Sequence, residues 1–303
     1  MKLVTILAES GQHQLGVKTE EGILNIQAAI EVVAGASSVP QSTHAVIEGG
    51  ASAIQQLQAY VDQALAASAA DKATFIQQES EIAYGPSVPN PRKIICVGLN
   101  YRRHAEETNA KIPTTPILFS KFDNTLTGHN HDVPLPKTSS KVDYEVELCI
   151  VIGKNAKYVS KEEALDHVFG YTVVNDISAR DLQLRTQQWL LGKTCDGFSP
   201  LGPYLVSADE VGDPNNLNLK LTVNGEVRQN SNTSDMIFYC DEIVSYISQH
   251  MTLYPGDIIL TGTPEGVILG YPEEKQVWLK HGDVMTVEIE KLGSLTNRMV
   301  DEA

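Results

Sequence analysis

The segment that most constrains the fold is Val142–Val151 (VDYEVELCIV), near the middle of the chain. Its pattern predicts a β-strand, in which successive side chains point to opposite faces. Glu145 and Glu147 would then share one face, opposite an apolar face. Carboxylates about 7 Å apart along a strand repel each other unless a cation lies between them. The segment therefore predicts either a divalent metal site or, more simply, an edge strand with one solvated polar face.

A third acid supports the metal site. Residues 169–175 form a second apolar run, and Asp176 follows it where residues 177–185 take helical spacing. Site residues are common where a strand ends and a helix begins. Three carboxylates without cysteine or histidine suit Mg²⁺ or Mn²⁺, with Ca²⁺ as a third candidate, better than Zn²⁺. Three protein ligands leave coordination positions open, which is typical of a catalytic ion.

Composition excludes several classes of partner. The 303 residues carry a net charge of −15 without a basic run, which argues against nucleic acid or an anionic membrane surface as a partner. No apolar segment approaches the length of a membrane span, and the apolar run at residues 3–8 is too short for a signal peptide. The four cysteines form no Cys-x-x-Cys pair, as expected for free thiols in a reducing compartment. We therefore expect a soluble, cytoplasmic protein.

The chain divides by pattern into a small N-terminal domain, residues 1–85, and a larger domain, residues 86–303. Three prolines within residues 85–92 indicate a linker between them. Asn224-Gly225 between two β-rich runs predicts a tight hairpin. The larger domain is mostly strands, expected at 93–97, 117–120, 142–153, 170–175, 204–206, 217–223, 257–261 and 284–291. Helices are expected at 51–70, 161–168, 178–191 and 239–250. The pattern is that of a β-dominated α+β protein.

Four motifs in collinear order resemble the fumarylacetoacetate hydrolase family. They are 97–107 (VGLNYRRHAEE), 145–147 (EVE), 174–183 (VNDISARDLQ) and 260–267 (LTGTPEGV), with 193–198 (KTCDGF) between the last two. The match covers roughly residues 91–292. The resemblance implies a mixed β-sandwich or β-roll catalytic domain beside the small N-terminal α/β domain. It also implies a homodimer and a metal held by Glu145, Glu147 and Asp176.

His104 and Glu107 are the candidates for acid–base chemistry. If residues 102–108 form a helical turn, the two share a face and can form a hydrogen bond. A carboxylate beside an imidazole fixes its tautomer and makes it a competent base. Spacing alone also allows a charged surface turn, but the resemblance implies a His–Glu pair on a short helix that closes over the metal. Spacing favours Glu107 over Glu106.

The resemblance assigns further roles around the metal. Lys193 matches a lysine that faces the metal, and Arg180 and Gln183 match positions that contact substrate. Thr263 matches a threonine that meets the substrate carboxylate. Tyr101 and Lys121 are weaker candidates. On the predicted helix 178–191, Gln183 and Gln187 would share a face.

One departure narrows the family branch. The longer hydrolases supply a fourth acid to the metal from the segment before the histidine, and residues 96–100 contain none. The shorter, broad-specificity branch of acylpyruvases, oxaloacetate decarboxylases and hydroxyheptadienedioate isomerases is the closer match. A competing metal motif, His129-x-His131, precedes Pro134 and Pro136, which are expected to break a strand.

The expected function is metal-dependent hydrolysis of a C–C bond in a 1,3-dicarbonyl 2-oxo acid such as an acylpyruvate. His104, oriented by Glu107, would activate a water molecule. Oxaloacetate decarboxylation or keto–enol isomerisation would use the same site without water attack. A non-catalytic metal- or metabolite-binding protein is a third hypothesis, and the His104–Glu107–Lys193 set argues against it.

Overall fold

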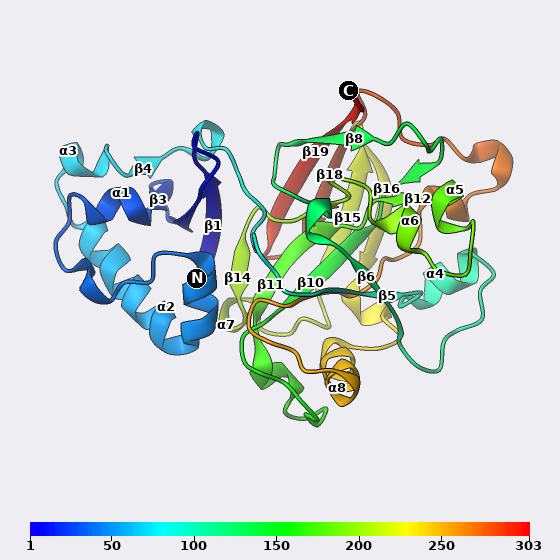
Figure 1. Cartoon of the computed structure of the whole chain (residues 1–303), viewed down its shortest axis with the longest axis horizontal. Helices are drawn as coiled ribbons and strands as arrows, with labels where there is room; N and C mark the ends of the chain where they lie inside the picture. Colours follow the sequence, from blue (N-terminus) through cyan, green and yellow to red (C-terminus); the bar gives the residue numbers. More distant parts are fainter.

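The computed structural model describes residues 1–35 and 37–303, and two β-sheets organise them (Figure 1). The larger has the strand order β4-β3-β2-β1-β14-β11-β10-β17-β5-β6 and the smaller β16-β15-β18-β19-β8. The strands of the larger sheet are β1 (Lys2–Leu7), β2 (His13–Lys18), β3 (Ile23–Asn25), β4 (Ile76–Gln77), β5 (Ile94–Gly98), β6 (Ile117–Lys121), β10 (Val146–Ile152), β11 (Val168–Asn175), β14 (Leu205–Ser207) and β17 (Ile258–Leu260). Those of the smaller are β8 (Asp132–Leu135), β15 (Asn218–Val223), β16 (Glu226–Asn232), β18 (Val284–Ile289) and β19 (Gly293–Asp301).

Two short pairings and a set of helices complete the fold. The pairings join β9 (Val142–Asp143) to β12 (Ser178–Ala179), and β7 (Leu126–Thr127) to β13 (Ser199–Pro200). The helices are α1 (Ile26–Ile30), α2 (Thr43–Leu65), α3 (Ala69–Lys72), α4 (Arg102–Glu107), α5 (Arg180–Gln183), α6 (Leu190–Lys193), α7 (Ala208–Val211) and α8 (Cys240–His250). The strand-rich α+β class expected from the sequence is confirmed.

Strand β10 lies inside the larger sheet, paired with β11 on one side and β17 on the other, and both of its faces are buried. Leu148 and Ile150 belong to the core between the two sheets, together with residues of β15, β18 and α8. Cys149 and Val151 belong to a second core, which includes residues of β1, β2 and α2. The alternation of side chains predicted for this segment is therefore confirmed, and the edge-strand interpretation is wrong.

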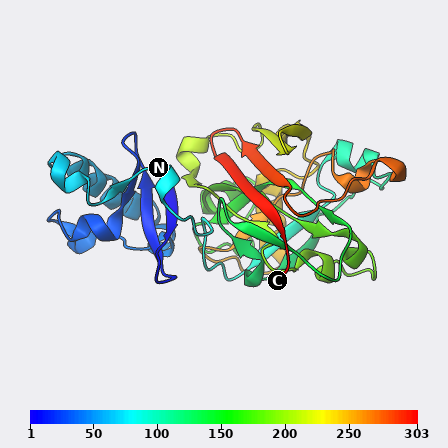
Figure 2. The same cartoon turned by 90° about the horizontal axis from the view of Figure 1, so that it is seen from above.

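The N-terminal residues extend the large sheet. Strand β1 pairs with β14, so β1–β4 continue the sheet that contains β10 and β11. Figures 1 and 2 show these strands and helices α1–α3 to one side of the rest. The predicted linker is packed against its neighbours, since Ser87 is buried and its hydroxyl lies 2.9 Å from that of Thr172. The domain boundary at residues 85/86 stays a prediction.

Helix predictions were less accurate than strand predictions. Helix α8 matches the predicted 239–250, and the hairpin at Asn224-Gly225 is confirmed, with both residues at positive φ. The helix predicted at 51–70 begins earlier, at Thr43, kinks at Gly50 and ends at Leu65. The one predicted at 161–168 is a single 3₁₀ turn, Ala164–His167, because Val168 already belongs to β11.

The helix predicted at 178–191 is not one continuous helix. The chain forms β12, the short α5 and, after an exposed turn, the short α6. Arg180 and Gln183 are buried, whereas Gln187 is exposed on the turn, so the two glutamines do not share a helix face. The turn folds α6 back so closely that a Cβ on Gly192 would lie 2.4 Å from the backbone oxygen of Ala179.

Pro134 does not break its strand. Strand β8 contains it and pairs in parallel with β19 at the edge of the smaller sheet. An edge strand tolerates proline because the missing N–H can face away from the partner strand. The expected break at this position is therefore wrong.

Candidate metal centre and active site

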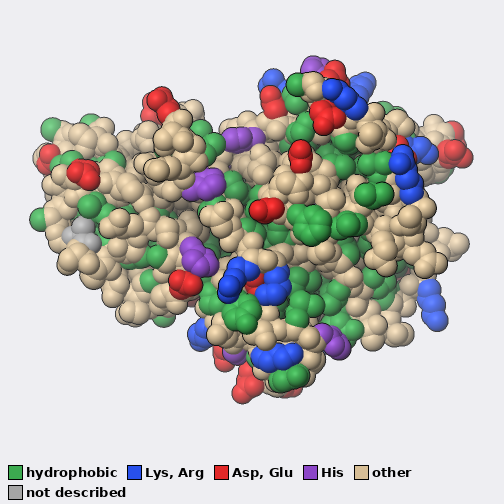
Figure 3. All heavy atoms as spheres, viewed as in Figure 1, with side chains coloured by type: hydrophobic (Ala, Val, Ile, Leu, Met, Phe, Trp, Pro, Cys, Tyr) green, Lys and Arg blue, Asp and Glu red, His purple; other side chains and the backbone are tan. Residues whose placement is uncertain are grey.

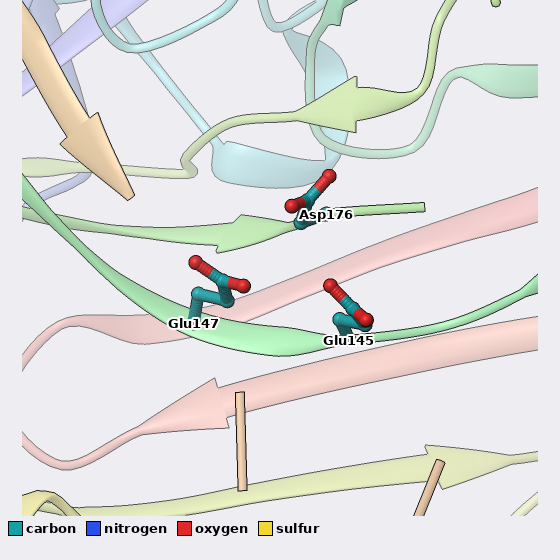
Figure 4. A group of neighbouring side chains, drawn as sticks. All are labelled: Glu145, Glu147 and Asp176. Carbon is teal, nitrogen blue, oxygen red and sulfur yellow. The ribbon is translucent and has the colours of Figure 1, made fainter. Parts of the chain in front are cut away.

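The end of β11 and the start of β10 bring three carboxylates together. Glu145 directly precedes β10, Glu147 is its second residue, and Asp176 directly follows β11. The strands are antiparallel with Val146 opposite Asn175, so these ends coincide. One oxygen from each carboxylate lies within 4.8 Å of the other two. Figure 4 shows the three side chains turned toward a common space.

Two buried lysines neutralise part of this charge. Nζ of Lys193 donates hydrogen bonds to Glu145 and Asp176, each at 2.8 Å. Lys121 pairs with the other oxygen of Asp176 and donates to two backbone carbonyls. Burial by itself would lower the pKa of Lys193, but Asp176 and Glu145 raise it above its ordinary value. Lys193 therefore carries a full positive charge at the edge of the carboxylate cluster.

Arg180 links the cluster to a fourth acid, Asp143. Its Nε donates to Asp143 at 2.9 Å, its Nη2 to Glu145 at 2.7 Å and its Nη1 to Gln183 at 3.0 Å. Asp143 also accepts the backbone N–H groups of Ile268 and Leu269 at 2.8 and 3.1 Å. The sequence analysis missed Asp143, although the spacing Asp-x-Glu-x-Glu places it two residues before Glu145.

The cluster fits a divalent cation. Four buried carboxyl groups face three cationic side chains, so one negative charge would remain with all four ionised. That charge falls on Glu147, which no lysine or arginine within the described residues pairs with and which accepts the Gly262 N–H at 2.8 Å. Burial, Asp176 and Glu145 raise the pKa of Glu147 well above its ordinary value. Burial would also raise the pKa of Glu145, but Lys193 and Arg180 lower it to about 2. Carboxylate oxygens around an uncompensated buried charge suit Mg²⁺ or Mn²⁺.

His104 and Glu107 form a pair on α4. Nδ1 of His104 lies 2.8 Å from Oε1 of Glu107, and His104 is buried. The Gly266 N–H donates to both oxygens of Glu107, at 3.2 and 3.0 Å. Glu106 is exposed. The geometry thus matches the choice of Glu107 over Glu106.

Helix α4 is tied to two other segments. Arg103 forms ion pairs with Glu265 at 2.9 Å and with Asp235 at 3.6 Å. Arg102 donates to the Met236 carbonyl at 3.2 Å. These contacts fix the helix that carries His104 in place beside the carboxylates.

A cavity of about 180 Å³ opens onto these groups. Its polar lining residues are His104, Thr108, Glu145, Glu147, Arg180, Gln183, Lys193 and Thr263. Asp176 is fully buried and does not line the cavity. The structure thus places His104, Lys193, Arg180, Gln183 and Thr263 around one space.

Two of the substrate-contact candidates differ from expectation. Thr263 lines the cavity, but its hydroxyl already donates to the Val146 carbonyl at 3.0 Å and accepts from Gln229 at 2.9 Å. Tyr101 is fully buried and does not line the cavity, and no group in the described residues bonds to its hydroxyl. Burial and the nearby Glu147 raise its pKa well above the ordinary value. The expected contact between Tyr101 and substrate is not supported by this placement.

The His129-x-His131 motif lies outside this centre. Nδ1 of His129 accepts the Thr296 N–H at 3.0 Å, and its ring packs edge-on against Tyr84. Within the described residues, the acidic triad is the one group of metal-ligating side chains whose donor atoms converge.

Two further features concern the surface charges and the hydropathy of the helices. On the face shown in Figure 3, acidic and basic side chains lie together at the top, whereas the acidic side chains on the left have no basic side chains beside them. Among the described residues, none of the helices combines the length and hydropathy that crossing a membrane requires.

Comparison with known proteins identifies relatives by sequence and by structure, and two of the relatives by sequence are oxaloacetate tautomerases. The mitochondrial oxaloacetate tautomerase FAHD2A of Bos taurus is 50% identical over 223 residues, covering 73% of this chain and 70% of the relative. The mitochondrial oxaloacetate tautomerase fahd2 of Xenopus laevis is 42% identical over 303 residues, covering 99% and 90%.

Solved structures share the fold over the whole chain. The 2-hydroxyhepta-2,4-diene-1,7-dioate isomerase of Mycobacterium marinum has a TM-score of 0.72 at 30% identity, covering 100% of this chain and 99% of that one. The maleylpyruvate hydrolase of Sphingobium sp. SYK-6, in complex with manganese(II) and pyruvate, has a TM-score of 0.78 at 30% identity and covers 100% of both chains. The model of the fumarylacetoacetate hydrolase C-terminal domain matches residues 93–300. This chain therefore belongs to the fumarylacetoacetate hydrolase family and is an enzyme.

Proposed function

We propose that the protein catalyses keto–enol tautomerisation of a 2-oxo acid, with oxaloacetate as the first substrate to test. The observation that carries the proposal is that His104, which is paired with Glu107, lines the same cavity as Glu145 and Glu147 of the carboxylate triad. The sequence analysis placed C–C hydrolysis first and isomerisation second. Relatives that are 42–50% identical and are named oxaloacetate tautomerases support the reverse order.

Glu145, Glu147 and Asp176 would hold Mg²⁺ or Mn²⁺. Such an ion supplies a Lewis acid that polarises the substrate's 2-oxo group and orients its carboxylate. Lys193 donates hydrogen bonds to Glu145 and Asp176. It would add a fixed positive charge near the substrate's 2-oxo oxygen, which becomes negative in the enolate. Gln183, on the cavity lining, would orient the substrate, whereas the Thr263 hydroxyl is already engaged by Val146 and Gln229.

His104 is the proposed base. With Nδ1–H donated to Glu107, its Nε2 is the unprotonated nitrogen and can take a proton from C3 of the substrate. The same nitrogen then returns a proton to carbon or passes it on to oxygen. Glu107 holds the tautomer, and the Gly266 N–H holds Glu107.

Arg180 takes a different role from the one the resemblance implied. Its Nε, Nη1 and Nη2 each donate to a protein group, namely Asp143, Gln183 and Glu145. We therefore propose that Arg180 positions Glu145 and Gln183 rather than binding substrate directly.

Hydrolysis of an acylpyruvate-like substrate remains the second candidate. A base that can take a proton from carbon can also take one from water, and a maleylpyruvate hydrolase with pyruvate bound shares the fold at 30% identity. Oxaloacetate decarboxylation would need the metal and Lys193 but no water attack. The homodimer and the cytoplasmic location stay predictions.

The deciding experiment follows the ultraviolet absorbance of enol-oxaloacetate and, in parallel, pyruvate release from oxaloacetate and acetylpyruvate. Metal-stripped protein is compared with protein restored with Mg²⁺ or Mn²⁺, and with His104→Ala. Metal-dependent decay of the enol without pyruvate release supports the tautomerase. Pyruvate from acetylpyruvate would make it a hydrolase, pyruvate from oxaloacetate alone a decarboxylase, and no reaction with any substrate would contradict all three.

A further inference from the structure

The cavity lining has two parts. The polar residues around the carboxylates are here called the polar floor, and the remaining lining forms an apolar wall. The side chains that form it are Val97, Leu99, Phe119, Leu184, Trp189 and Leu269. Phe119 and Trp189 pack edge to face with ring centroids 5.3 Å apart. Gly98 makes room for the indole, because a Cβ there would lie 2.5 Å from Trp189. The wall is therefore a preformed hydrophobic surface in the cavity that His104 also lines.

The cations that line this cavity are already engaged. Lys193 contacts Glu145 and Asp176, and Arg180 contacts Asp143 and Glu145. In the described residues that form the wall, no further lysine or arginine is present. A substrate carboxylate directed at the wall would lose contacts with water without gaining a free cationic partner, which is unfavourable. A hydrocarbon group there would gain burial instead.

We propose that this site also accepts 2-oxo monocarboxylic acids with a branched aliphatic or aromatic group beyond C3, and catalyses their keto–enol exchange. The inference rests on the proposed tautomerase activity and names its substrate class. In oxaloacetate the second carboxylate is bonded to C3 itself, so it stays beside the polar floor. In longer dicarboxylic 2-oxo acids it reaches the wall.

The reaction needs no co-reactant. Nε2 of His104 takes the C3 proton, and the C–H electron pair becomes the C2–C3 double bond while the carbonyl pair moves to the 2-oxo oxygen. The reverse step returns a proton to C3. In D₂O the imidazole exchanges its proton with solvent, so each cycle places deuterium on C3.

A matched pair of acids tests the proposal. 4-Methyl-2-oxopentanoate and 2-oxoglutarate both have a C3 methylene and similar length, but one ends in two methyl groups and the other in a carboxylate. Proton NMR in D₂O measures C3 exchange by the Mg²⁺- or Mn²⁺-loaded full chain, with oxaloacetate as reference and protein-free samples as blanks. We expect the apolar acid to exchange at least about tenfold faster than 2-oxoglutarate.

A variant and a binding measurement complete the test. Leu184 lies on the cavity wall but is 60% exposed, so Leu184→Arg places a cation there without disturbing a core. It should reverse the preference toward 2-oxoglutarate. Binding is read separately from the fluorescence of Trp189 in a Trp278→Phe background, since the chain has two tryptophans. The apolar acid should bind more tightly.

The outcomes separate the two claims. If oxaloacetate exchanges but 2-oxoglutarate matches or exceeds the apolar acid, the inference is overturned and the tautomerase stands. If none of the acids exchanges, the tautomerase is overturned, and fluorescence decides the pocket assignment: tighter binding of the apolar acid supports it, and equal or weaker binding overturns it.

Discussion

Nδ1 of His104 and Oε1 of Glu107 lie 2.8 Å apart on one face of α4, three residues apart in sequence. The pair is not a local feature alone, because the Gly266 N–H binds Glu107 from a loop 159 residues away. Gly270 also lies so close that a Cβ there would be 2.6 Å from the Glu107 carboxyl carbon. The imidazole is therefore oriented by a contact that depends on the folded loop after β17.

Replacing Glu107 tests whether this orientation matters. Glu107→Gln keeps the size of the side chain but removes the charge that fixes the histidine tautomer. We expect kcat for enol–keto conversion to fall by roughly a hundredfold, with KM changed much less. Glu106→Gln, on the exposed side of the same helix, is the control and should leave kcat unchanged. Equal losses in both variants would indicate a general effect on α4.

The residues that could be found from the sequence are those whose pattern is local. Glu145 and Glu147 alternate with apolar residues along a strand buried on both faces, and Asp176 directly follows a second such run. The pairing of β10 with β11 then brings them together. The sandwich architecture itself came from the family resemblance, since strand patterns alone do not specify which sheets stack.

What could not be found depends on long-range contacts. The helix predicted at 178–191 has helical spacing, but Arg180 is held by Asp143 and Glu145, and the chain turns after Gln183 to bring Lys193 back to the same cluster. Asp143 was missed because the Asp-x-Glu-x-Glu spacing does not show whether such an acid is a buried ion-pair partner or is solvated.

Asp143 should be a positioning residue for the centre. Asp143→Asn weakens its contacts to Arg180 and to the N–H groups of Ile268 and Leu269. Outer partners of metal-ligand networks typically contribute about ten- to a hundredfold in activity or metal affinity, so we expect a loss of that size in both. Isothermal titration with Mn²⁺ and kcat measurements check this.

Asp181→Asn is the matched control for Asp143→Asn. Asp181 accepts hydrogen bonds from Ser139 and Ser140. Within the described residues, its side chain forms no hydrogen bond with Arg180. Its replacement should change neither metal affinity nor kcat. Loss of thermal stability without loss of metal affinity in Asp143→Asn would contradict a positioning role.

Metal removal should destabilise the protein as well as inactivate it. Four carboxyl groups against three cations leave Glu147 without a cationic partner, and a bound divalent ion would supply one in place of a proton. Ligand at about 100 times Kd contributes ~2.7 kcal/mol, which corresponds to a rise in Tm of roughly 5 °C for a chain of this size. Differential scanning calorimetry with chelator, Mg²⁺ and Mn²⁺ measures it. Glu147→Gln should show a much smaller rise, and an equal rise would place the ion elsewhere.

Metal affinity should rise with pH because of Glu147. Burial, Asp176 and Glu145 raise the pKa of this carboxyl well above 4.5 in the folded protein. In the metal-free state its contribution to stability is therefore full below pH 4.5 and is lost as the pH rises through the folded value. A cation binds the deprotonated carboxylate and must displace the proton, so Kd should fall about tenfold per pH unit while Glu147 is mostly protonated. Calorimetric titrations in buffers of different ionisation enthalpy count the released proton. In Glu147→Gln that proton should be missing and the pH dependence weaker. A pH-independent Kd in the unmodified protein would show that Glu147 is ionised before the metal arrives.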